Sequence, residues 1–162
     1  MSTKLIGLDT SSSKSGYSIF VNGEYTNSGV IDWHTEKNSD IRLYKMCISL
    51  LYVLNQEQPN IVVAEMTAVT RNASAQRMLT MILGVIYGWC IVHNVEFVML
   101  RPTEWRALIS KEKKGRKREE LKAWSVKTVK EKYGLEVSDD EADSILIGQS
   151  LINKRDKGAN GI

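Results

Sequence analysis

Two carboxylates stand at the ends of apolar segments, where the hydrophobic pattern gives way to polar residues. Asp9 ends the segment 4–9, and Glu65 ends the segment 60–65. Asp140 and Asp143 are three residues apart in a segment with helical periodicity, so they share one face of the predicted helix. If the two apolar segments are neighbouring strands, the strand ends and the helix face bring these four carboxylates together.

A cluster of this kind has a definite chemistry. Carboxylates that lie close together repel one another, and removal from water strengthens the repulsion. The cluster is tolerable around a cation, and an all-oxygen ligand set suits Mg²⁺, with Mn²⁺ as a substitute. Two such ions can activate a water and stabilise the leaving oxygen of a phosphodiester. The alternative is structural, since Asp9 also suits a turn and Asp140 and Asp143 also suit a helix N-terminus.

Positive charge is concentrated in one segment. Residues 111–122 contain seven basic and three acidic residues, a charge of +4, whereas the whole chain carries +3. A segregated basic segment is typical of a protein with a polyanionic partner, although a solvent-exposed loop is the alternative. We expect the basic side chains at the start of this segment to contact DNA phosphates: Lys111, Lys113, Lys114, Arg116, Lys117 and Arg118.

The composition excludes several other classes. No apolar run reaches the roughly 18 residues that span a bilayer, and the N-terminus lacks a signal-peptide pattern, so we expect a cytoplasmic location. Cys47 and Cys90 lie in apolar helical patterns, which favours free thiols over a disulfide. With only His34 and His93, and no cysteine pair at ligand spacing, a structural zinc site is not expected.

The elements that must position the acids follow from periodicity. Segments 4–9, 16–21 and 24–31 are predicted strands, and Asn22-Gly23 between the last two suits the type I′ turn of a hairpin. Helical spacing begins near Asp40, where Ser39 or Asp40 would cap the helix. The further predicted elements are a helix over 40–56, a strand over 60–65, a helix over 73–93, a strand over 95–100, and helices over 102–108, 118–132 and 139–153.

This order predicts an α/β fold with a five-stranded mixed sheet, three antiparallel strands followed by βα units, flanked by helices. We expect one domain over residues 1–156 and a frayed tail over 157–162. The helix near 74–92 is apolar on nearly every face, and one sheet cannot cover all of it. A two-fold dimer that buries the excess is therefore expected.

Three motifs, in order, resemble those of the RuvC-like Holliday-junction resolvases in the RNase H-like superfamily, and most of all short phage-type members. The first runs from Gly7-Leu-Asp9 to Gly16-Tyr17. The second runs from Glu65 to Arg71-Asn72, and the last is Asp140-Glu-Ala-Asp143. The sequence departs from the family at Thr10-Ser11, where the family has Pro-Gly, and at Ala68, where the family has an aromatic residue.

The resemblance implies a homodimer with an RNase H-like fold that places paired nicks in four-way or other branched DNA, in a bacterial or phage-infected cell. It implies that Asp9, Glu65, Asp140 and Asp143 are the catalytic residues and the ligands of two Mg²⁺ ions per site, and that Arg71 and Asn72 join the basic segment in binding DNA. Asp139 remains an alternative to Asp140, because Asp139 and Asp143 also share a face. Loss of the aromatic at Ala68 implies a relaxed sequence preference.

Three other functions fit parts of the pattern. A nuclease that cuts RNA–DNA hybrids would use the same acids. An actin-like ATPase has a phosphate loop that begins like the first motif, but it needs two such domains around its nucleotide. A non-catalytic junction-binding module is disfavoured, because four acids without a metal would repel DNA.

Overall fold

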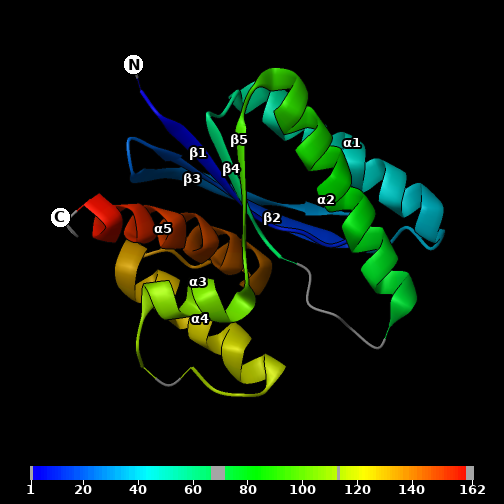
Figure 1. The fold of residues 1–162 in the computed structure, drawn as a ribbon. Helices are drawn as coiled ribbons and strands as arrows, with labels where there is room; N and C mark the ends of the chain where they lie inside the picture. Colours follow the sequence, from blue (N-terminus) through cyan, green and yellow to red (C-terminus); the bar gives the residue numbers. More distant parts are fainter. Residues whose placement is uncertain (1, 67–71, 113, 160–162) are drawn as a thin grey trace.

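The computed structural model describes residues 2–66, 72–112 and 114–159. Ten elements follow one another in the order that the sequence predicts, as Figure 1 shows. The strands are β1 (Lys4–Asp9), β2 (Lys14–Val21), β3 (Glu24–Asp32), β4 (Ile61–Glu65) and β5 (Glu96–Leu100). The helices are α1 (Ser39–Glu57), α2 (Ala73–His93), α3 (Pro102–Ile109), α4 (Arg118–Tyr133) and α5 (Asp139–Ala159).

The strands form one five-stranded mixed sheet in the order β3-β2-β1-β4-β5. β1 pairs antiparallel with β2, and β2 with β3, whereas β4 pairs parallel with both β1 and β5. Asn22 and Gly23 have φ angles of 53° and 83° between β2 and β3, as a type I′ turn requires. The predicted α/β fold with a mixed sheet is confirmed.

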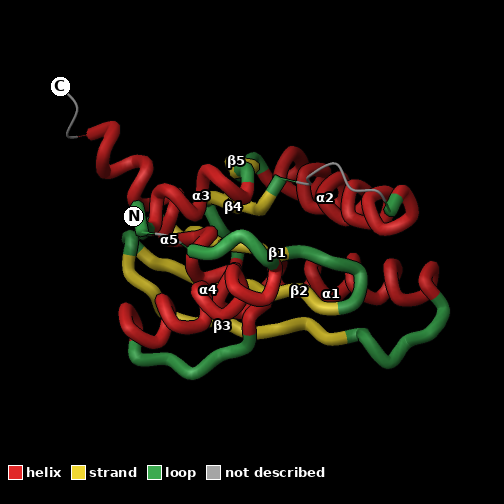
Figure 2. Tube along the Cα trace, turned by 90° about the horizontal axis from the view of Figure 1, so that it is seen from below, coloured by secondary structure: helices red, strands yellow, loops and turns green. Residues whose placement is uncertain are grey.

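Helices cover both faces of the sheet (Figures 1 and 2). α1 and α2 pack on one face with Ile6, Leu8 and Ala64, among others. α3, α4 and α5 pack on the other face with Leu5 and Val63. Because side chains alternate along a strand, the odd-numbered positions of β1 and β4 face α5, and Asp9 and Glu65 continue that series. The pleat therefore directs both strand-end acids towards the helix that carries the other two.

Two glycines let α5 approach the sheet closely. A Cβ atom at Gly7 would overlap the carbonyl oxygen of Ser144, and one at Gly16 would overlap that of Asp140. The Ser18 hydroxyl on β2 donates a 2.7 Å hydrogen bond to the Ser144 carbonyl oxygen and fixes the helix at this distance. The absence of side chains at these two positions brings the N-terminal turns of α5 against the end of β1.

Helix boundaries depart from the sequence prediction in two places. Asn38, rather than Ser39 or Asp40, caps α1, and its side chain accepts hydrogen bonds from the backbone of Asp40 and Ile41. α5 continues to Ala159 instead of ending near Asn153, so it enters the segment for which a frayed tail was expected. Just beyond Asn153, Lys154 forms an ion pair with Glu104 on α3, and Arg155 forms one with Glu96 on β5. These two ion pairs attach the start of the extension to the rest of the domain.

The helix α2 is long and apolar enough, by length and composition alone, to cross a membrane, with a mean hydropathy of 1.4 over its most apolar window. Five of its residues are buried in the core with α1 and the sheet: Ile82, Leu83, Ile86, Trp89 and Cys90. Packing against the sheet thus accounts for one side of the helix, and the opposite side remains exposed.

Candidate active site

One pocket of about 610 Å³ lies where β1, β4 and the N-terminus of α5 meet. It brings together all four acids that the sequence predicts: Asp9, Glu65, Asp140 and Asp143. Asp139 also lines it. The remaining charged lining residues are basic: Lys14, Arg106, Arg116, Arg118 and Lys122. Carboxylates and cations therefore share one pocket, an arrangement that suits a divalent metal and a phosphodiester.

The carboxylates act strongly on one another. Part of Asp9 faces the pocket, but dense surrounding protein desolvates its carboxyl group and, together with the charges of Asp143, Glu65 and Asp140, raises its pKa well above the ordinary value. Burial likewise raises the pKa of Asp143 to about 6, although the Ser125 hydroxyl and Arg106 oppose the shift. Both shifts show that the site disfavours its own negative charge and would gain stability from a cation.

Three buried polar atoms at this place lack a hydrogen bond of normal geometry within the described part of the chain: Arg106 Nε, Ser125 Oγ and Asp143 Oδ1. Buried polar atoms are seldom left in this state, because each costs roughly 1–3 kcal/mol. Arg106 and Ser125 both act on Asp143, so these three buried groups lie together behind the acid cluster.

Glu65 has its position fixed by α3. Its Oε2 accepts a 2.6 Å hydrogen bond from the indole nitrogen of Trp105, and Arg106 Nη2 lies 4.0 Å from the same oxygen. Burial raises the pKa of Glu65, while the Trp105 hydrogen bond and the Arg106 charge counteract the rise. The carboxylate is thus oriented from one side by two residues of one helix.

The two candidates at the start of α5 differ in their partners. Asp139 forms an ion pair with Lys122 on α4. Burial acts to raise the pKa of Asp139, but the Lys122 hydrogen bond and charge outweigh it and lower the pKa. For Asp140, burial and the neighbouring Asp139 raise the pKa, and the Lys122, Lys14 and Arg118 charges only partly offset them. Because Lys122 already binds Asp139, the geometry favours Asp140 as a metal ligand.

The predicted DNA-binding residues are divided between the pocket and other places. Arg116 and Arg118 line the pocket with the acids. Asn72 instead caps α2, where its side chain accepts a hydrogen bond from Ala75 N. The ammonium group of Lys114 donates to two backbone carbonyl oxygens and lies 5.4 Å from the centre of the Trp124 ring. Lys111 is exposed, and Lys117 caps α4; Ala68, Arg71 and Lys113 lie outside the described residues.

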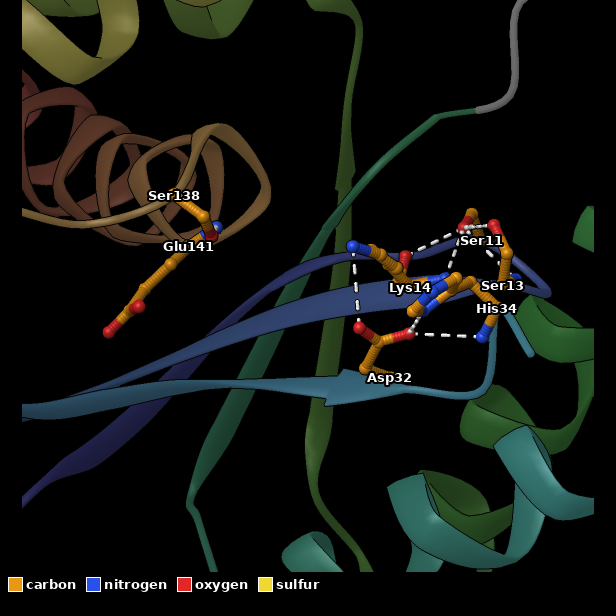
Figure 3. A network of polar contacts seen from close by, with 7 residues as sticks. All are labelled: Ser11, Ser13, Lys14, Asp32, His34, Ser138 and Glu141. Atoms are coloured by element: carbon orange, nitrogen blue, oxygen red, sulfur yellow. Dashed lines mark hydrogen bonds and ion pairs between the residues drawn. The ribbon is translucent and has the colours of Figure 1, made fainter.

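Sequence analysis missed three basic residues of the pocket: Lys14, Arg106 and Lys122. Lys14 opens β2, and its Nζ lies 3.3 Å from Asp32 Oδ2 on the neighbouring strand (Figure 3). The other oxygen of Asp32 accepts a 3.0 Å hydrogen bond from the backbone of His34. Lys14 and Arg106 stand outside the basic segment and gave no local charge signal, and Lys122 ends that segment beyond the residues that were expected to contact DNA. Only the folded sheet and helices bring the three to the acids.

The residues fit a divalent metal in their chemistry. As they stand, no three His, Cys, Asp or Glu side chains among the described residues form a group that could hold a metal ion. The donor set of the pocket is nevertheless all oxygen, so a hard cation suits it.

Comparisons with known proteins bear on the fold. No protein-family model matches this sequence, and no curated protein matches it. Among solved structures, RuvC of T. thermophilus in complex with Holliday junction substrate is similar, with a TM-score of 0.74, 14% identity and 96% of each chain covered. The Fowlpox virus resolvase, in complex with Holliday junction DNA, has a TM-score of 0.63 and 18% identity, with 94% of this chain and 99% of that chain covered.

A third similar structure is the yeast mitochondrial Holliday junction resolvase Ydc2, with a TM-score of 0.61, 16% identity and coverage of 98% of this chain and 81% of that chain. The three come from a bacterium, a virus and a yeast, and the similarity extends over nearly the whole length of this chain. The chain therefore has the fold of the RuvC-type Holliday-junction resolvases, as the motifs predict.

Proposed function

We propose that this protein is a metal-dependent, structure-selective DNA endonuclease that resolves Holliday junctions or other branched DNA by paired nicking. The observation that carries the proposal is the pocket in which Asp9, Glu65, Asp140 and Asp143 meet basic side chains. The fold supports it, because two similar structures contain Holliday junction DNA. A site that combines five acids with five cations suits phosphodiester chemistry better than the chemistry of a neutral substrate.

The four acids would hold two Mg²⁺ ions, or Mn²⁺ in their place. When bound, such ions activate a water and stabilise the leaving 3′ oxygen of a cut phosphodiester. The chain itself supplies the ligand geometry: Asp9 and Glu65 come from rigid strand ends, and Asp140 and Asp143 from one helix face. Arg106 adds a positive charge beside Glu65 and Asp143, where it would offset the negative charge of a phosphate.

The basic wall of the pocket would bind the phosphates on either side of the cut. Arg116 and Arg118 stand at the start of α4, where Glu120 Oε2 accepts hydrogen bonds of 2.8 and 3.1 Å from the backbone of Arg116 and Lys117. This arrangement orders the end of the basic segment before DNA arrives. Contacts of this kind position the enzyme without reading sequence, which agrees with selection of branched shape.

We further propose that the protein works as a homodimer through α1 and α2. Between them lies an apolar groove of about 510 Å³, lined by Leu43, Tyr44, Cys47, Met81 and Val85, among others. Large apolar side chains stand exposed around it, including Ile48 at 48% and Met81 at 52%. A second copy would cover this face by two-fold symmetry and provide the second active site that paired nicking needs.

The test is to incubate the purified protein with Mg²⁺ or Mn²⁺ on a labelled four-way junction, a Y-fork, a linear duplex and an RNA–DNA hybrid. We expect cuts in the junction at symmetric positions, slower cuts in the fork, and no cuts in the duplex or without metal. Cleavage of the hybrid with an intact junction would replace this proposal by an RNA–DNA hybrid nuclease. Binding of the junction without any cleavage would leave a non-catalytic junction-binding module.

A further inference from the structure

A buried tryptophan lies directly behind one of the acids. The Trp105 side chain is fully buried, at 0% exposure, and its Nε1 donates a 2.6 Å hydrogen bond to Glu65 Oε2. We propose that Trp105 is a positioning residue for Glu65, whose indole N–H fixes the carboxylate in the orientation in which it binds the divalent metal. This inference rests on the proposed metal-dependent function.

The surroundings of Trp105 make it a rigid support. α3 starts at Pro102, separated from the end of β5 by one residue, and its only buried residue is Trp105, which belongs to the core cluster formed by the sheet, α4 and α5. The Arg106 guanidinium lies 4.5 Å from the centre of the Trp105 ring, and the Trp124 ring centre lies 6.4 Å away. These neighbours and the complete burial of the side chain restrict the orientation of the ring and of its N–H.

Glu65 needs such a support more than the other acids do. It is the last residue of β4, so strand pairing ends at this position. A glutamate also has one more rotatable bond than an aspartate, so its carboxylate is harder to fix. The indole N–H is a donor only, and in the protein interior it must have an acceptor. The pair therefore holds Glu65 Oε2 at one point beside Asp9 and Asp143.

The chain offers a matched control in its second core. Trp89 is also buried, at 7% exposure, and its Nε1 donates a 2.8 Å hydrogen bond to Asn55 Oδ1. It packs with α1 on the opposite face of the sheet from Trp105. Trp105→Phe and Trp89→Phe each remove one indole N–H and part of one ring, but only Trp105→Phe affects an acid of the pocket.

The experiment measures Mn²⁺ binding by calorimetry and the rise in melting temperature with Mg²⁺ for the parent and both variants. Removal of a partner behind a metal ligand costs roughly 10–100-fold in metal affinity. We expect that loss for Trp105→Phe, with parent-like affinity for Trp89→Phe and parent-like junction binding for both in metal-free buffer. Equal metal affinity in the parent and Trp105→Phe overturns the inference.

A second variant separates the N–H from the packing of the ring. At position 105, an amino acid that carries benzothiophene in place of indole keeps the bicyclic shape but has sulfur where the N–H was. We expect it to fold like the parent and still bind Mn²⁺ more weakly, and parent-like binding would refute the inference even if Trp105→Phe is unfolded. If the parent itself binds no metal and cuts no junction, the proposed function is wrong. If the parent binds metal and cuts junctions, and the variants at position 105 bind metal equally well, only the role of Trp105 is refuted.

Discussion

Burial raises the pKa of Asp9 at the end of β1 and of Asp143 on α5; the charge of Asp143 adds to the rise at Asp9, and the charge of Glu65 adds to the rise at both. Proteins arrange such mutual repulsion where a cation or a proton is to be bound. The Arg106 charge lowers the pKa of Asp143, but it does not cancel the effect of burial, and the pKa stays at about 6. A bound cation or proton would therefore relieve the repulsion among these acids.

The pKa of Asp143 predicts how metal-free stability depends on pH. Its folded pKa of about 6 lies above the unfolded value of 3.8, so the folded state binds more protons between these values. Stability should therefore fall as the pH rises from about 4 to 6. Asp143→Asn removes the charge and should raise the free energy of unfolding at pH 7 by about 1–3 kcal/mol. Urea unfolding in EDTA at pH 4 and 7 measures both effects.

The ligand role predicts a separation of cleavage from binding. Asp9→Asn, Glu65→Gln and Asp143→Asn each remove one ligand charge and preserve the side-chain shape. We expect each variant to cut the junction more than roughly 100-fold more slowly than the parent. Loss of a residue that only hydrogen-bonds to a metal ligand costs up to about 100-fold, and loss of a ligand should cost more. Binding should persist or tighten, because repulsion of the phosphates falls. A variant that cuts at nearly the parent rate shows that its residue is not a ligand, and gel-shift and cleavage assays on one junction decide this.

At the level of elements, the pocket depends on how closely α5 approaches β1 and β2. Gly16→Ala places a methyl group against the carbonyl of Asp140, so α5 must move away from the sheet. Overpacking of this kind costs about 1–3 kcal/mol, and here it also displaces Asp140 and Asp143. Gly158→Ala is the control, since nothing lies within 4 Å of the added atom. We expect only Gly16→Ala to lower both stability and cleavage, measured by urea unfolding and the junction assay.

The elements were predictable because their signals are local. The strand β1 ends at Asp9 and α2 spans 73–93 as periodicity predicts, and Asn22-Gly23 forms the expected turn. The cap of α1 was missed because Ser39 and Asp40 are equally good cap residues by type, and Asn38 takes the role through its backbone geometry. The C-terminal end of α5 was missed because the residues there are polar and show no apolar helical period. Ion pairs with Glu96 and Glu104, which are distant in sequence, attach this part of the helix.

The site was predictable only in part, for a physical reason. The acids stand at strand ends and on one helix face, so the pleat and the helical period place them correctly from sequence. The cations of the pocket have no such pattern: Lys14 arrives from a strand start and Arg106 from α3. The hydrogen bond between Trp105 and Glu65 joins residues 40 positions apart, and no spacing rule connects them. The Asp139–Lys122 ion pair, which favours Asp140 as the ligand, likewise depends on how α4 packs against α5.

For the molecule as a whole, the exposed apolar face of α1 and α2 predicts a dimer. Met81→Asp places a charge in the groove and should convert the dimer to a monomer of 18.3 kDa. Lys127→Asp on α4 is the control, because its side chain is exposed and pairs only with Glu131 among the ion pairs of the described residues. Sedimentation at micromolar concentration measures the mass, and a monomeric parent would refute the prediction.

If two copies of the acid pocket cut a four-way junction together, they should cut a supercoiled plasmid at an extruded cruciform on both sides of the junction. Two cuts within the lifetime of one complex linearise the plasmid, whereas a single cut only nicks and relaxes it. We expect the parent with Mg²⁺ to yield mainly linear plasmid cut at the cruciform, and Asp9→Asn to leave the plasmid supercoiled. An intact plasmid with the parent would show that the protein does not cut junctions, and linear product that persists with Asp9→Asn would show that the acid pocket does not make the cuts.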